Sequence, residues 1–137
     1  MWNLDNIQLG ICYDPEGKLG STQYEELSFG SIDGKPDMYR HYTSSTAPVD
    51  PNRLQKYDLA VVTVGNHTYY ELCVPWTEIL SDTYDFTTIE VGNTIDIGVQ
   101  FNDNDGGTYG RKGTMIYGWG TSGQKDHKMF TKYYIEK

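Results

Sequence analysis

The chain has 137 residues and a formal net charge of −8. That length fits one domain over residues 1–137, with enough chain to bury a core. The acidic charge argues against nucleic acid and against an anionic membrane surface, because both bind to basic faces. No apolar run reaches the roughly 20 residues needed to insert into a bilayer. We therefore expect a neutral ligand, and sugars are the largest neutral ligand class outside cells.

The composition favours strands over helices. There are 12 Tyr, 3 Trp, 4 Phe and 15 Gly, with few Leu and Ile. Aromatic and β-branched residues suit strands, and glycine suits turns. The two cysteines, Cys12 and Cys73, are too few for a disulfide framework. Either they form one disulfide bridge or they are two semi-buried thiols.

The first half of the chain alternates and then turns. Residues 7–12 place aliphatic side chains at odd positions, which indicates a strand. A turn is expected over 14–17, a second strand over 24–29 and a second turn over 33–36. Residues 43–56 form the longest polar stretch and are expected to be a surface loop.

A hairpin is the clearest local prediction. Residues 57–64 and 67–74 both resemble strands, and Gly65-Asn66 between them tolerates the positive φ of a two-residue turn. Pro75 ends the second strand because it cannot donate to the sheet. Residues 76–80 suggest one helical turn, with Thr77 as its N-cap.

The second half supplies the remaining strands. Residues 95–101 alternate aliphatic with polar side chains, which predicts one buried and one wet face. Residues 114–119 and 130–135 are expected to be the last strands. About eight strands and no long helix indicate an all-β fold, an antiparallel β-sandwich of jelly-roll-like form.

A dense polar cluster follows the strand at 95–101, and its members are Asn102, Asp103, Asn104, Asp105, Gly106 and Gly107, with Arg111 beyond. Oxygen-rich, glycine-flexed loops bind hard cations, so Asp103 and Asp105 are candidate Ca²⁺ ligands. The spacing does not match the helix-loop-helix calcium pattern. Two other interpretations of the cluster stay open. In one, its side chains form hydrogen bonds with the backbone of the same loop; in the other, they contact a ligand directly.

Aromatic residues near polar strand ends suggest a sugar platform. Trp2, Tyr109, Tyr117 and Trp119 are the candidates. A flat ring covers the apolar face of a sugar, while amides, carboxylates and Arg bond its hydroxyl rim. Tyr117 and Trp119 lie on the strand face opposite Ile116, so they face water if Ile116 faces the core. Ordinary packing is the alternative for each ring taken alone.

Enzymatic arrangements are weak in this chain. His41, His67 and His127 lack the spacing of a helical metal site, and there is no G-x-S-x-G nucleophile motif. Chance carboxylate pairs are unavoidable with 19 acidic residues, so they do not indicate glycoside cleavage. A haem would need axial ligands such as Met115 or Met129 together with a His, and the spacing of these residues does not support a haem site. We therefore predict that the protein is not an enzyme.

Three segments together resemble carbohydrate-binding module family 9. Residues 2–15 resemble its W-x-x-D first strand, 69–76 its E-x-x-I-P-W strand, and 92–113 its G-x-x-I…N-D-x-D…R-x-G segment. The resemblance implies a sugar-binding β-sandwich, often with structural calcium, in which Trp2 and the residue at Gln8 contribute to the site and Trp119 would be the second Trp. Family members usually carry strands before the first motif. Three interpretations of this difference therefore stay open: the domain is shortened, it is excised from a longer protein, or a partner supplies the strands.

We expect an extracellular or cell-surface, non-catalytic module that binds polysaccharide and is attached to other domains. An interaction or structural module without a sugar site and a small glycoside-acting enzyme are the alternatives. The predicted ligand-binding residues are Trp2, Gln8, Gln100, Asn102, Asp103, Tyr109, Arg111, Tyr117 and Trp119.

Overall fold

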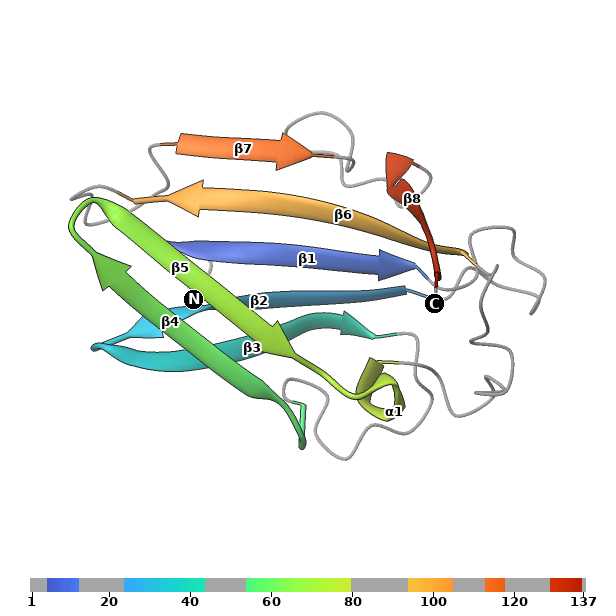
Figure 1. Cartoon of the computed structure of the whole chain (residues 1–137), viewed down its shortest axis with the longest axis horizontal. Helices are drawn as coiled ribbons and strands as arrows, with labels where there is room; N and C mark the ends of the chain where they lie inside the picture. The colour runs from blue at the N-terminus through green and yellow to red at the C-terminus, as the bar shows by residue number, and fades with distance from the viewer. Residues whose placement is uncertain are drawn as a thin grey trace.

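The computed structural model describes residues 5–12, 24–43, 54–79, 94–104, 113–117 and 129–136, with only the backbone of 43 and of 113–117. These residues form eight strands and one short helix: β1 (Asn6–Cys12), β2 (Tyr24–Ile32), β3 (Lys35–Thr43), β4 (Asp58–Val64), β5 (His67–Cys73), α1 (Trp76–Ile79), β6 (Thr94–Asp103), β7 (Gly113–Tyr117) and β8 (Thr131–Tyr134) (Figure 1).

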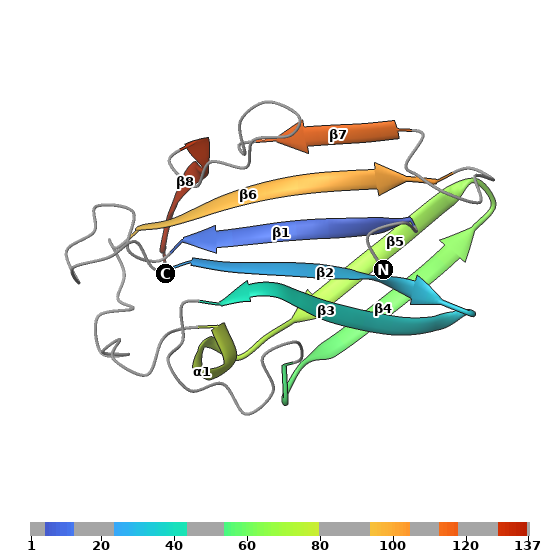
Figure 2. The same cartoon turned by 180° about the vertical axis from the view of Figure 1, so that it is seen from behind.

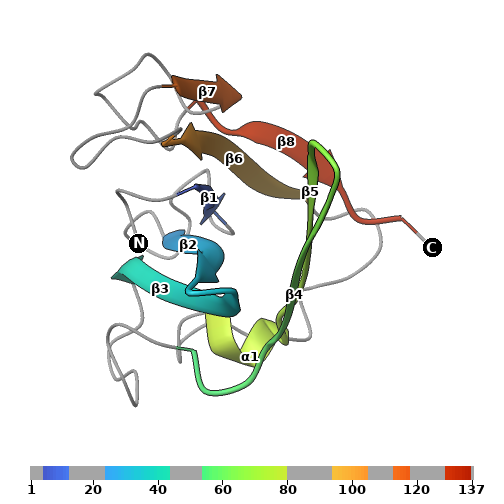
Figure 3. The ribbon, with the colours of Figure 1, turned by 90° about the vertical axis from the view of Figure 1, so that its left-hand side faces the viewer.

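Most strands belong to one antiparallel sheet. Its order is β3-β2-β1-β6-β7, and β8 pairs with the other end of β6. β4 and β5 pair only with each other among the described strands and run obliquely across one face of the large sheet (Figures 1 and 3). Seen from behind, the large sheet passes in front of this hairpin (Figure 2). The prediction of a predominantly β, antiparallel fold is confirmed.

β3 was not expected from the sequence. The predicted turn over 33–36 is shorter in the structure, because only Asp33 and Gly34 turn, with φ of 51° and 75°. Positive φ at both central residues is the type I′ pattern, which suits a two-residue hairpin loop. Pro36 then lies in β3 at the edge of the described sheet, where a strand can accommodate a residue without an N–H.

The β4–β5 hairpin matches its prediction closely. Gly65 has a φ of 61°, but the φ of Asn66 is not positive, although the sequence predicted that it would be. A positive φ at the first of the two turn residues alone is the type II′ pattern. The helix begins at Trp76, so Thr77 lies inside it and the N-cap prediction is wrong. The Glu78 amide donates to the Pro75 carbonyl at 2.9 Å, which closes this single turn.

The apolar core lies between the large sheet and the hairpin. Alternation in β1 and β2 directs Leu27 and Phe29 toward the hairpin, and Leu59, Tyr70 and Leu72 of the hairpin pack against them. Other members of this core are Ile7, Leu9, Ile11, Met38, Leu54, Ile79, Ile95 and Ile97. Burying this apolar area is the main force that holds the two sheets together.

The other face of the large sheet is polar and nevertheless buried. The alternation in residues 95–101 predicts that this face is wet, and that prediction is wrong. Asp96, Gln100 and Asn102 are only 8, 3 and 5 % exposed. Side-chain amides on neighbouring strands bond one another, and this offsets the cost of removing them from water.

Cys12 is buried and Cys73 is exposed, and no disulfide joins them. Within the described part of the chain, no helix is long and apolar enough to cross a membrane.

Candidate functional site

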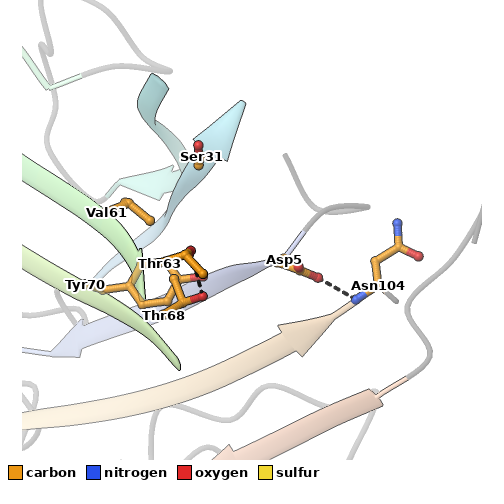
Figure 4. A pocket seen from close by; sticks show the side chains of 7 residues that line it. All are labelled: Asp5, Ser31, Val61, Thr63, Thr68, Tyr70 and Asn104. Atoms are coloured by element: carbon orange, nitrogen blue, oxygen red, sulfur yellow. Dashed lines mark hydrogen bonds between the residues drawn. The ribbon is translucent and has the colours of Figure 1, made fainter. Parts of the chain in front are cut away.

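A pocket of about 210 Å³ opens where the tip of the hairpin meets one end of the large sheet. Seven residues line it: Asp5, Ser31, Val61, Thr63, Thr68, Tyr70 and Asn104 (Figure 4). They come from the start of β1, the end of β2, both hairpin strands and the end of β6. Four regions that are far apart in sequence, one of them the β4–β5 hairpin, therefore meet at this pocket.

The sheet side of the pocket is held by Asp5. Its Oδ1 atom accepts a hydrogen bond of 2.7 Å from the backbone N–H of Asn104, which joins the start of β1 to the end of β6. The register that pairs Asn6 with Asn102 brings these two residues together. Gly30 on the other side of β1 allows the close approach, since a Cβ there would lie 2.7 Å from the Asp5 carbonyl oxygen. The Asn104 backbone amide therefore holds the Asp5 carboxylate, and the close approach to Gly30 fixes the Asp5 backbone.

The hairpin side is built by residues that share one face of β4 and β5. Val61 pairs with Tyr70 and Thr63 with Thr68, so all four point the same way. The Oγ1 atoms of the two threonines lie 3.1 Å apart in a hydrogen bond. The ring of Tyr70 packs edge-on against Phe29, with centroids 6.2 Å apart and an interplanar angle of 73°. Contact with the core thus fixes the ring of Tyr70 in place.

Several polar groups in the pocket have no protein partner among the described residues. The second carboxylate oxygen of Asp5 and the hydroxyls of Ser31 and Tyr70 make no hydrogen bond there. Burial, and secondarily the negative charge of Asp5, raises the pKa of Tyr70 above its ordinary value of 10.0. The phenol consequently stays protonated and can donate to a ligand. The pocket offers a donor, an anionic acceptor, hydroxyls and one ring.

A buried amide network lies beside this pocket on the polar face of the sheet. We use this name for Asn6, Gln8, Gln100 and Asn102. The Gln100 Nε2 atom donates to Gln8 Oε1 at 2.8 Å and to Asn102 Oδ1 at 2.7 Å. The Asn102 Nδ2 atom donates to Asn6 Oδ1 at 2.9 Å. These bonds hold β1 and β6 in the register that places Asp5 beside Asn104.

The same polar face continues onto β2 and β3. The Ser28 Oγ and His41 Nε2 atoms lie 2.6 Å apart, and the His41 ring meets Tyr39 edge-on. The rings of Tyr24 and Tyr42 stack with centroids 4.2 Å apart and an interplanar angle of 13°. Aromatic and amide side chains therefore do gather on this face, but its amides bond to one another.

Of the residues that the sequence grouped as a sugar site, the structure brings three together and places Asp103 on the other side of its strand. Gln8, Gln100 and Asn102 belong to the amide network, whereas Asp103 is exposed and points to the opposite side of β6. In the backbone register, Tyr117 pairs with Val99 and Ile116 with Gln100. The predicted residues outside the described ranges are Trp2, Tyr109, Arg111 and Trp119.

Of the two residues predicted to bind calcium, the structure describes only Asp103. Asp103 is exposed, and Asp105 lies outside the described residues. No three His, Cys, Asp or Glu side chains converge to hold a metal within the parts of the chain that the structure describes. Calcium binding stays a prediction from the sequence.

Sequence reasoning missed the pocket but came close to two of its walls. Asp5 belongs to the W-x-x-D segment, and Asn104 belongs to the polar cluster after β6. No pattern in the sequence pointed to Thr63, Thr68 and Tyr70 as pocket residues, since alternation gives the face of a hairpin but not what that face meets.

No family model, no curated protein and no solved structure matches this chain.

Proposed function

We propose that the protein is a non-catalytic carbohydrate-binding domain, and that the pocket at the hairpin tip is part of its binding site. The single observation that carries this proposal is the chemistry of the pocket lining. An aromatic ring, a carboxylate, an amide and several hydroxyls surround a space suited to one sugar ring. Sugars need this combination of an apolar contact with bonds to hydroxyl groups.

The resemblance to carbohydrate-binding module family 9 supports the same proposal. On this proposal the two sheets form a β-sandwich of jelly-roll type, in an extracellular protein that binds polysaccharide through this domain. Trp2 lies three residues before Asp5 in the sequence, so it is a natural candidate for a stacking ring beside the pocket. Calcium bound by Asp103 and Asp105 would stabilise the loop that follows β6.

Replacing Tyr70 with phenylalanine tests the proposal. The change removes only the hydroxyl and keeps the ring contact with Phe29. We expect affinity for the bound glycan to fall about three- to tenfold, the worth of one hydrogen bond. Thermal stability should not fall, because the hydroxyl has no protein partner among the described residues.

Tyr69→Phe is the matched control. Tyr69 is the adjacent residue of β5, points away from the pocket and is 61 % exposed. Affinity electrophoresis against a panel of soluble polysaccharides identifies a bound glycan, and calorimetry with its oligosaccharide measures the two variants. Equal affinity of wild type and Tyr70→Phe would remove the pocket from the binding site. Binding to no polysaccharide in the panel would remove the proposed function.

A protein-interaction module is the second candidate, and one surface favours it. Val62, Val64 and Tyr69 on the outer face of the hairpin are 53, 62 and 61 % exposed. Contiguous apolar side chains on a surface often mark a protein interface. This candidate predicts association that Tyr69→Ser weakens, measured by sedimentation, with no effect of Tyr70→Phe.

A further inference from the structure

We propose that the pocket prefers glycans that carry a free amino group over neutral glycans and excludes glycans built from uronic acids. This inference rests on the proposed function, since it names the class of sugar that the same pocket accepts. The ligand it points to is a glucosamine-type unit with an unacetylated ammonium group.

Asp5 is the single charged residue among the seven that line the pocket. The others are uncharged: Ser31, Val61, Thr63, Thr68, Tyr70 and Asn104. Among these seven lining residues there is no lysine, arginine or histidine to offset the carboxylate. A ligand in the pocket therefore meets one full negative charge, which attracts an ammonium group and repels a carboxylate.

The carboxylate is oriented for an incoming donor. Its Oδ1 atom is held by the Asn104 amide at 2.7 Å, while its second oxygen has no protein partner among the described residues. Hydrogen bonds between a charged donor and a charged acceptor are about twice as strong as neutral ones. An ammonium group can therefore gain a charge-assisted bond here that a sugar hydroxyl cannot match.

The field of Asp5 also reaches across the pocket. Its charge contributes to the raised pKa of Tyr70 on the opposite wall. Asp5 and Tyr70 line the same pocket from the sheet and from the hairpin, so a ligand between them lies close to the carboxylate. A ligand placed between them lies within that field, so the preference is a property of the pocket and not only of the overall charge of −8.

Two variants separate the pocket charge from the overall charge. Asp5→Asn removes the charge and keeps an oxygen to accept from the Asn104 amide. Asp58→Asn makes the same change in net charge at an exposed position, at the end of the hairpin far from its tip. Any general attraction for cationic glycans weakens equally in both, whereas an effect of the pocket weakens only in Asp5→Asn.

The experiment compares four oligosaccharides of equal length by calorimetry at low ionic strength: glucosamine, N-acetylglucosamine, glucose and galacturonic acid. We expect the glucosamine oligomer to bind about fivefold tighter than the glucose oligomer, the upper range for an exposed ion pair. N-acetylation should abolish the advantage, and the galacturonic acid oligomer should bind weakest. The ratio of glucosamine to glucose affinity should fall to about one in Asp5→Asn and persist in Asp58→Asn.

The outcomes distinguish this inference from the proposed function. Equal binding of the glucosamine and glucose oligomers, or undiminished binding of galacturonic acid, overturns the charge preference and leaves the carbohydrate-binding domain in place. An equal fall of the ratio in both variants assigns the preference to the net charge and overturns the role of Asp5. Binding to none of the four overturns the inference, and the polysaccharide panel then decides whether the proposed function fails as well.

Discussion

Replacing Gln100 with methionine removes the central donor of the amide network while keeping a side chain of similar length. The Gln100 Nε2 atom bonds two buried acceptors, Gln8 Oε1 at 2.8 Å and Asn102 Oδ1 at 2.7 Å. A buried acceptor without a donor costs about 1–3 kcal/mol. Because Asn102 keeps a further interaction, we expect a total loss of about 2–4 kcal/mol in the free energy of unfolding.

Urea unfolding followed by intrinsic fluorescence measures this loss. Gln55→Met is the control, since Gln55 is exposed and only its backbone amide bonds Glu78, so its cost should stay within about 0.5 kcal/mol. The double variant Gln8→Met, Gln100→Met should cost less than the sum of the single variants, because both members of the pair become apolar. A small cost for Gln100→Met together with lost glycan binding would refute this reasoning and make Gln100 a ligand contact.

Three further changes test the fold around the site. Arg40→Met should cost about 3–5 kcal/mol because it removes the cation that lies 3.1 Å from the buried Glu25 carboxylate. The double change Arg40→Met, Glu25→Leu should recover much of this cost in urea titrations. Gly30→Ala should cost about 1–3 kcal/mol by thermal unfolding, because its Cβ would lie 2.7 Å from the Asp5 carbonyl oxygen; a cost near zero would contradict the close approach. Burial raises the pKa of Asp96 above its ordinary 3.8, although Lys132 partly opposes this. The folded state therefore loses stability as pH rises through that raised pKa. Asp96→Asn should be more stable than wild type near pH 7, and this advantage should shrink toward pH 3. An advantage independent of pH would contradict this reasoning.

Prediction from the sequence succeeded where a local rule decides the structure. Gly65 between two alternating runs predicted the hairpin, and the alternation of Ile95, Ile97 and Val99 predicted β6. It failed at β3, where Pro36 and a register shift between Glu26 and Leu27 break the alternation. Strand pairing with β2 overrides the weak local preference there.

The candidate site shows the same division. The sequence indicated that the segments around Asp5 and Asn104 carry polar chemistry, because both lie in motifs rich in carboxylates and amides. It could not indicate that Tyr70 of the hairpin faces them, since this depends on how two sheets pack. It also assigned Gln8 and Gln100 to a ligand. In the structure they are buried and bond each other, and their contact with a ligand stays a prediction.

The residues alone determined a predominantly β, antiparallel fold, its main hairpin and a net charge of −8. Periodicity and turn chemistry act over a few neighbouring residues, so a single sequence carries them. Tertiary structure alone decided which polar face is buried and which side chains enclose the pocket. Those outcomes depend on the order of strands in the sheet and on the angle of the hairpin across it, which join residues about 100 positions apart, as in the contact of Asp5 with Asn104.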